Sequence, residues 1–190
     1  MTDNYISNKV FSDVDFTINR LPIGEYDQCT FANCNFAKSD ISNCVFLESN
    51  FIDCNLALTK TKNTRFQEIQ FTNCKLLGVP FNECDTFLLA FNFENCNLNL
   101  SSFYQLKLIG IKFKNCTLHE VDFVEGNFTN AVFDNCELNN AIFKNSNLMN
   151  CNFITAINFN IDPGTSKLKG ASFSRNEISG LLLKHQIIIV

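Results

Sequence analysis

Nine phenylalanines recur along the chain at an interval of twenty residues, and this spacing limits the possible fold more than any other feature. The interval changes once, to twenty-two residues, between Phe71 and Phe93. A repeat of about twenty residues is typical of a solenoid, in which one coil cannot bury its own apolar side chains and stacked coils supply the core. The members of this ladder are Phe11, Phe31, Phe51, Phe71, Phe93, Phe113, Phe133, Phe153 and Phe173. We expect those from Phe31 to Phe153 to form the structural core.

Within each interval, a large apolar residue recurs every five positions, as at Phe31, Phe36, Ile41 and Phe46. Four steps of five residues complete one interval of twenty. The sequence therefore predicts a square coil with four five-residue sides, whose coils stack at about 4.8 Å, the spacing of paired strands. The expected molecule is a short, stiff rod.

All ten cysteines lie two positions before an apolar centre, where a small side chain is needed. A buried cysteine of this kind behaves as a small hydrophobe, so we expect reduced thiols that fill the core. Disulfides between stacked neighbours and metal binding remain the alternatives. Six of the ten align in one column: Cys34, Cys54, Cys74, Cys96, Cys116 and Cys136.

A column of Asn and Asp residues directly precedes these cysteines. Side chains of this type tolerate tight turn geometry and bond to the local backbone, and stacked Asn amides can bond along a rod axis. We interpret the column as the residues that build one corner of the coil. It contains Asn33, Asp53, Asn73, Asn95, Asn115 and Asn135.

The change of interval places two extra residues within 84–91. The expected structure there is a small bulge, and Asp85, Thr86 and Phe87 are the irregular residues in it to test as a partner contact. Simple repair of the register is the alternative. In the five-residue count, Leu88 would be the apolar centre of the fourth side of this coil.

Composition favours one soluble domain without catalytic chemistry. The chain has 190 residues, 46% hydrophobic and 18% charged, with a formal net charge of -4. It contains no Cys-x-x-Cys pair, no His-Glu-x-x-His, no phosphate-binding glycine loop and only two histidines, His119 and His185. From these motifs we expect no enzyme activity, no metal and no cofactor.

The same composition argues against membrane and nucleic-acid partners. No apolar run is long enough to cross a bilayer, and no secretion signal begins the chain, so we expect a cytoplasmic protein. The sequence pI is near 5.1 and the aromatic residues are needed for the core, so direct binding of DNA or RNA is not expected.

The end of the chain leaves the repeat after residue 173, which divides it into a solenoid, 1–173, and a C-terminal segment, 174–190. Ser174 and Glu177 form a capping-box pattern that predicts the start of a helix. A short strand, Ile187–Val190, is expected to follow, and continuation of the coil is the competing interpretation. An exposed apolar strand is an aggregation edge. We therefore expect a homodimer, with an intramolecular cap as the alternative. The dimerisation residues would be Ile178, Leu181, Leu182, Leu183, Ile187, Ile188 and Ile189.

Several segments resemble the pentapeptide-repeat family, among them Cys34-Asn35-Phe36, Cys54-Asn55-Leu56, Cys96-Asn97-Leu98 and Cys151-Asn152-Phe153. The resemblance covers nearly all of 10–173 and implies an all-β fold, a right-handed quadrilateral parallel β-helix. The tail from Leu168 to Val190 is similar to the C-terminal dimerisation module of the Qnr-type quinolone-resistance proteins. That second resemblance implies a DNA mimic that binds DNA gyrase or topoisomerase IV and protects it from quinolones.

Two functions therefore remain open: topoisomerase protection by an acidic rod, and a general interaction scaffold with another partner. The eight intervals from Phe11 to Phe173, at about 4.8 Å each, give a rod of roughly 38 Å. Duplex DNA carries one negative charge per about 1.7 Å, so a rod of this length would need about twenty charges to match it. A net charge of -4 permits only local mimicry. The candidate partner-contact residues are Glu48, Glu68, Glu83, Asp85, Phe87, Glu120, Asp122 and Glu125.

Overall fold

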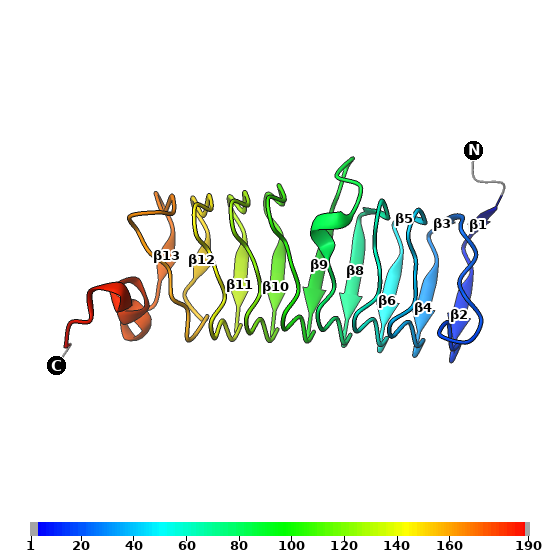
Figure 1. Cartoon of the computed structure of the whole chain (residues 1–190), viewed down its shortest axis with the longest axis horizontal. Coiled ribbons are helices and arrows are strands. Elements are labelled where there is room, and N and C mark those ends of the chain that lie inside the picture. Colours follow the sequence, from blue (N-terminus) through cyan, green and yellow to red (C-terminus); the bar gives the residue numbers. More distant parts are fainter. Residues whose placement is uncertain (1–3, 189–190) are drawn as a thin grey trace.

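The chain forms a parallel β-solenoid, which confirms the predicted fold class. The computed structural model describes residues 4–188. It is an elongated rod with β1 (Tyr5–Ser7) and β2 (Val10–Ser12) at one end and short helices at the other (Figure 1).

All strand pairs are parallel, and they form two sheets that run along the rod. The larger sheet has 9 strands and the smaller has 4. The larger sheet continues from β2 through β4 (Thr30–Ala32), β6 (Asn50–Ile52), β8 (Ile69–Thr72), β9 (Phe91–Glu94), β10 (Lys112–Lys114), β11 (Val132–Asp134), β12 (Asn152–Phe153) and β13 (Ser172–Phe173). The smaller sheet joins β1 to β3 (Glu25–Asp27), β5 (Val45–Leu47) and β7 (Arg65–Gln67).

The remaining two sides of the coil are held by single parallel bridges, such as Asn35↔Asn55 and Asp40↔Lys60. Backbone groups therefore pair between coils on all four sides, in steps of twenty residues. The one change of register lies between β8 and β9, where Phe71 pairs with Phe93.

The phenylalanine ladder occupies the inside of the larger sheet. Its rings stack on their neighbours with centroid distances between 4.6 and 5.4 Å. Phe51 and Phe71, for example, lie 5.0 Å apart with an interplanar angle of 21°. The seven from Phe31 to Phe153 are all at most 1% exposed. Rings of adjacent sides meet edge to face, an arrangement that stabilises aromatic pairs beyond their buried area.

The cysteines contribute hydrogen bonds as well as volume, a role that sequence reasoning missed. All ten are free and buried. The Cys54 thiol donates to the carbonyl oxygen of Phe31, 23 residues earlier, at 3.2 Å. Ser49 and Thr59 donate through their hydroxyl groups to the equivalent carbonyls, of Tyr26 and Phe36. The position therefore selects a small side chain that can donate to the previous coil.

The buried thiols of Cys84 and Cys151 are held in the protonated form. Burial raises the pKa of Cys84 and of Cys151 to about 12. A protonated, buried thiol is a poor nucleophile and a poor metal ligand.

Left-handed backbone conformations form the corners of the coil, and the predicted Asn/Asp column occupies one of them. Asn73 and Asn95, for example, have φ of 55° and 54°. The amide of Asn73 donates to Asp53 at 2.9 Å, and that of Asn95 donates to Asn73 at 3.1 Å. The corner-building interpretation is confirmed, because these side chains bond to one another along the rod.

The expectation that Leu88 is a core centre is wrong. Leu88 is 66% exposed and has a left-handed φ of 52°. Phe91 fills the core there instead, with its ring 5.1 Å from Phe81 and 6.3 Å from Phe66. The extra residues let the chain leave the fourth side of the coil before it rejoins the larger sheet at Phe91. A count in steps of five residues does not predict this departure.

The C-terminal segment contains the expected helix, in 3₁₀ form, but differs from expectation at the capping box and at Ile187 and Ile188. It forms two 3₁₀ helices, η2 (Arg175–Leu181) and η3 (Leu183–His185). The Ser174 hydroxyl accepts from the Asn176 N–H, but Glu177 accepts from the Asn158 N–H instead of completing a capping box. Ile187 and Ile188 are not in a strand, and the rest of the predicted strand lies outside the described residues.

The first of these helices packs against the last coil. The Ile161 N–H donates to the carbonyl of Gly180 at 3.0 Å. A Cβ at Gly180 would meet the carbonyl oxygen of Phe159 at 2.6 Å or less, so glycine is required for this approach. Leu181 packs on the core beside it. The helix thus covers the apolar end of the solenoid within one chain.

Phe113→Ala should lower the free energy of unfolding by about 3 to 5 kcal/mol, because it empties a buried ring site between two stacked neighbours. Lys112→Ala, on the outward side of the same strand, should leave the unfolding midpoint unchanged. Urea denaturation followed by circular dichroism measures both. Equal effects of the two substitutions would contradict the inside and outside assignment.

Candidate protein-binding site

The described part of the chain offers no obvious catalytic or metal chemistry. Among residues 4–188, no group of three or more His, Cys, Asp and Glu side chains is placed to hold a metal ion. His119 lies 3.0 Å from Glu137, as a single exposed pair. In the same residues no helix is both long and apolar enough to span a bilayer.

The main irregularity of the rod is the loop that contains the extra residues, 86–90, which we call the insertion loop. It follows the 3₁₀ helix η1 (Phe81–Glu83) and projects from the rod just before β9 (Figure 1). The register locates it: Arg65 pairs with Asp85 in steps of twenty, whereas Ile69 pairs with Phe91 in steps of twenty-two.

The base of the insertion loop is fixed by polar contacts with β7. Arg65 donates to the Asp85 carboxylate at 2.8 Å, and its guanidinium lies 5.1 Å from the centre of the Phe87 ring. The Phe87 N–H donates to the same carboxylate at 2.9 Å. That backbone donor, together with Arg65, holds the pKa of Asp85 below its usual value. Gln67 completes the set by donating to the Phe87 carbonyl at 3.3 Å.

This bracing presents two large apolar side chains to solvent. Phe87 is 58% exposed and Leu88 is 66% exposed. Neither is needed to fill the core, because Phe91 occupies that place. Adjacent exposed apolar side chains on a braced loop are typical of a protein-binding surface.

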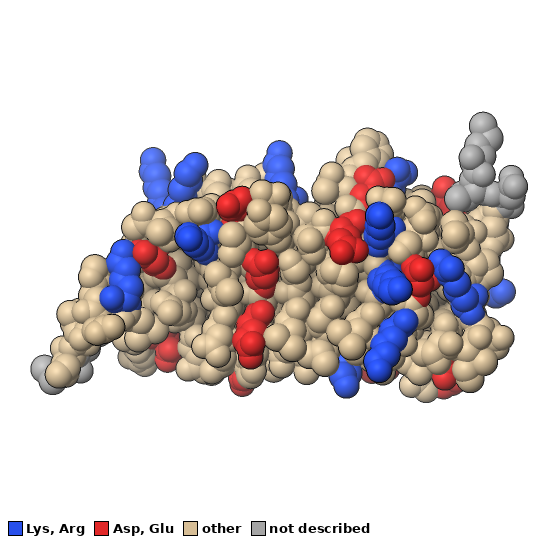
Figure 2. Space-filling view, viewed as in Figure 1, with Lys and Arg blue, Asp and Glu red and all other residues tan. Residues whose placement is uncertain are grey.

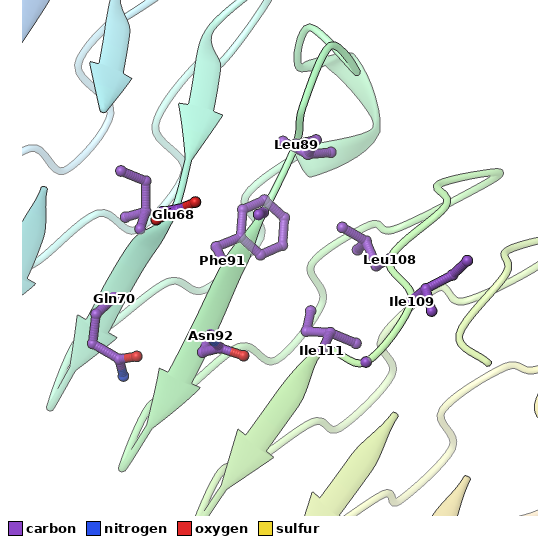
Figure 3. Close-up of a pocket in the computed structure, with 11 residues that line it drawn as sticks. Glu68, Gln70, Leu89, Phe91, Asn92, Leu108, Ile109 and Ile111 are labelled. Carbon is purple, nitrogen blue, oxygen red and sulfur yellow. The ribbon is translucent and has the colours of Figure 1, made fainter. Parts of the chain in front are cut away.

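A hollow lies on each side of the insertion loop. Figure 3 shows the first, where Leu89 and Phe91 face Leu108, Ile109 and Ile111 of the next coil, with Glu68 and Gln70 on the opposite edge. The second, which we call the loop groove, has a volume of about 560 Å³. The loop groove is lined by Asp27, Leu47, Glu48, Gln67, Glu68, Leu88, Leu89 and Ala90.

Four of the predicted contact residues gather around the insertion loop. Glu48 and Glu68 line the loop groove, and Asp85 and Phe87 belong to the loop and its base. Sequence reasoning missed Leu88 and Arg65, which share the same site. The sequence signal for Arg65 is its position twenty residues before Asp85. This spacing places the two residues side by side only if the insertion lies after Asp85, which the structure shows.

The other four predicted residues lie elsewhere on the rod. Glu83 ends η1 at the corner before the loop. Glu120 occupies the corner after the second side, diagonally opposite the corner of Glu48 and Glu68. Asp122 accepts from the Val124 N–H at 2.9 Å, and Glu125 accepts from Gln105 at 2.8 Å, so both carboxylates serve local structure.

Charge on the rod is mixed in sign. Figure 2 shows Lys and Arg interspersed with Asp and Glu on the visible face, without a continuous acidic stripe. Ion pairs between coils account for part of this pattern, as in Lys114 with Glu94 at 2.8 Å.

The fold and the stacked five-residue sides define a parallel β-solenoid of pentapeptide repeats. The family model described as pentapeptide repeat region matches residues 25–92 and 90–183. The chain therefore belongs to the pentapeptide-repeat family.

Several solved structures are similar to the chain at low sequence identity. Full-length QnrB1, a plasmid-mediated fluoroquinolone resistance protein, has a TM-score of 0.49 and 18% identity over 97% of this chain and 100% of that chain. HetL from Nostoc sp. strain PCC 7120, involved in heterocyst differentiation regulation, has a TM-score of 0.42 and 15% identity over 90% and 87%. No curated protein matches the chain in sequence.

Arg65→Gln should loosen the insertion loop, because it removes the partner of the Asp85 carboxylate and the cation over the Phe87 ring. We expect the backbone amide of Phe87 to exchange at least tenfold faster with deuterium, measured by NMR. Arg20→Gln is the matched control, since Arg20 forms a comparable ion pair with Asp40 at 3.4 Å outside the loop. An unchanged exchange rate in Arg65→Gln would show that the loop is held by other contacts.

Proposed function

We propose that this chain is a non-catalytic, cytoplasmic rod that binds a protein partner through the insertion loop, and that the partner is a type II topoisomerase, DNA gyrase or topoisomerase IV. By occupying the enzyme, the rod would protect it from quinolones. The observation that carries the binding role is the braced loop with its exposed Phe87 and Leu88. Family membership and the resemblance of the tail to Qnr-type proteins support the choice of partner.

The charge pattern favours local recognition over imitation of a whole DNA duplex. Duplex DNA presents one negative charge per about 1.7 Å on a uniform surface. This rod carries a net charge of -4, and both signs are interspersed on the face that Figure 2 shows. Contact is therefore expected at the insertion loop, where carboxylates and apolar side chains are adjacent.

A scaffold that joins other proteins is the second candidate. The same insertion loop favours it, since Phe87 and Leu88 are suited to many apolar partner surfaces. The choice between the two functions depends on the partner, and no bond is made or broken in either.

We also propose that the chain forms a homodimer through its C-terminal segment. Only the inner face of η2 is used to cover the last coil, through Gly180 and Leu181. Ile178 and Leu183 remain exposed, as do Ile187 and Ile188, the latter at 90%. Leu182 is half-buried, and Ile189 lies outside the described residues. A second copy would bury this apolar surface and lengthen the rod.

Purified protein should restore gyrase supercoiling of plasmid DNA in the presence of ciprofloxacin. Phe87→Ala should raise the concentration required at least tenfold, because a buried aromatic anchor carries much of the energy of a protein interface. Ile154→Ala is the control, since Ile154 has similar exposure, 51%, outside the loop. Neither protection nor inhibition over a wide concentration range would leave the scaffold function.

Sedimentation equilibrium at micromolar concentration should give the mass of a dimer. The double substitution Ile187→Asp with Ile188→Asp should give a monomer of 21.6 kDa, because it places charge in the apolar contact. Ile18→Asp, at the opposite end of the rod, should remain dimeric. A monomeric parent protein would show that η2 serves only as an intramolecular cap.

A further inference from the structure

The loop groove combines an apolar wall with an acidic edge. Leu88, Leu89 and Ala90 of the insertion loop form one side, and Leu47 of β5 contributes to the other. Apolar atoms supply more of the exposed lining than polar atoms do. A ligand with only polar groups would leave this wall uncovered, and one with only apolar groups would bury the carboxylates without partners, which is costly.

Three carboxylates line the loop groove, from Asp27, Glu48 and Glu68, and no Lys or Arg lines it. Asp27 accepts from the Tyr5 hydroxyl at 2.8 Å, and Glu48 accepts from the Gln28 amide at 3.1 Å. Both donors are neutral. Among residues 4–188 none of the three carboxylates forms an ion pair. The groove is therefore negative and available to a cation.

The solenoid itself does not require glutamate at these positions. Glu48 and Glu68 occupy successive left-handed corners, with φ of 44° and 55°, one coil apart. At a coil spacing of about 4.8 Å, stacked like charges destabilise one another. Beyond the insertion loop the same corner continues with Gly110, Asn130 and Asn150, which are neutral and equally left-handed. The two glutamates thus carry a cost that the fold alone does not explain.

Arg65 does not relieve this cost. Its guanidinium is engaged by the Asp85 carboxylate and lies over the Phe87 ring, and Arg65 is not among the lining residues of the loop groove. Arg65, the basic residue that contacts the loop, is used to hold the loop in place, and no Lys or Arg of the described residues lines the groove to compensate its charge.

We infer that the loop groove binds an arginine side chain from an apolar, basic segment of a protein partner. The aliphatic part of the arginine would lie on Leu47 and Leu88, and the guanidinium would reach Glu48 and Glu68. Arginine matches both parts, because its stem packs on apolar surface while its planar head pairs with carboxylates and is weakly hydrated. The inference rests on the proposed function only in requiring a protein partner, and it specifies what that partner presents.

The peptide Leu-Arg-Leu-Arg-Leu-amide, labelled with fluorescein at its N-terminal amine, tests the inference by fluorescence anisotropy with the full chain. The paired substitution Glu48→Gln with Glu68→Gln should weaken binding at least tenfold, and replacing both arginines by citrulline in the peptide should weaken it similarly. Glu120→Gln is the matched control, since Glu120 is another exposed, left-handed corner glutamate, on the opposite edge. Leu88→Asn, which retains the left-handed corner, should weaken binding at least threefold.

Each result decides the inference. Absence of peptide binding would overturn it, as would equal weakening by Glu120→Gln, because binding would then be a general charge effect. The same variants in the gyrase assay separate the two proposals. If peptide binding depends on Glu48 and Glu68 but the parent protein does not protect or inhibit gyrase, the groove is retained and the topoisomerase partner is overturned. Gyrase protection by the parent protein, without peptide binding that depends on Glu48 and Glu68, would retain the partner and overturn the groove.

Discussion

Hydrogen bonding between parallel backbone segments one coil apart is the interaction on which the rest of the structure depends. Because residues twenty positions apart pair between coils on either side of the insertion, side chains of the same column lie over one another, as Phe31, Phe51 and Phe71 do. Stacked phenylalanines, donating thiols and amide ladders are all consequences of this register. The core is a set of parallel columns. The packing of a side chain therefore depends more on the other residues of its column than on its neighbours in sequence.

The same constraint explains why two extra residues have a large local effect. A five-residue side has no room for two more residues while its pairing with the adjacent coils is kept. The chain therefore leaves the side of the coil and returns to it, as it does between Asp85 and Phe91. The core loses one centre on the fourth side, and Phe91 turns inward to replace it. Leu88 is left outside with Phe87, and Arg65 of the preceding coil pairs with Asp85 and lies over the Phe87 ring. A defect in the repeat thereby becomes a surface feature with its own apolar and charged groups.

Sequence periodicity predicted the columns of repeated side chains correctly, and it gave wrong positions at the insertion and at the C-terminal segment, where the repeat is interrupted. The phenylalanine, cysteine and asparagine columns follow from counting, because a column exists only if its members share one environment. Leu88 was misplaced because counting cannot tell on which side of an insertion the register resumes. The capping box at Ser174 and Glu177 failed for a related reason: Glu177 bonds to Asn158 of the preceding coil, a tertiary contact that no local motif encodes.

The thiol hydrogen bonds show a further limit of sequence reasoning. Cysteine, serine and threonine alternate at one position, and composition suggested only small size. In the structure, Cys54, Ser49 and Thr59 each donate to a carbonyl 23 residues earlier, so the property they share is a donor on a short side chain.

The position of the acidic groups relates the fold to recognition. A solenoid presents each corner residue at a fixed spacing along the rod, so two glutamates at successive corners form a pair whose separation the backbone sets. On an otherwise mixed surface, such a pair attracts a cation only where neighbouring apolar groups exclude water and weaken screening. The insertion loop supplies those groups at the one corner where Glu48 and Glu68 are stacked. In the proposed binding of an arginine side chain, the register defect supplies the apolar wall and the acidic corner supplies the carboxylates, so the binding site depends on both features at the same place.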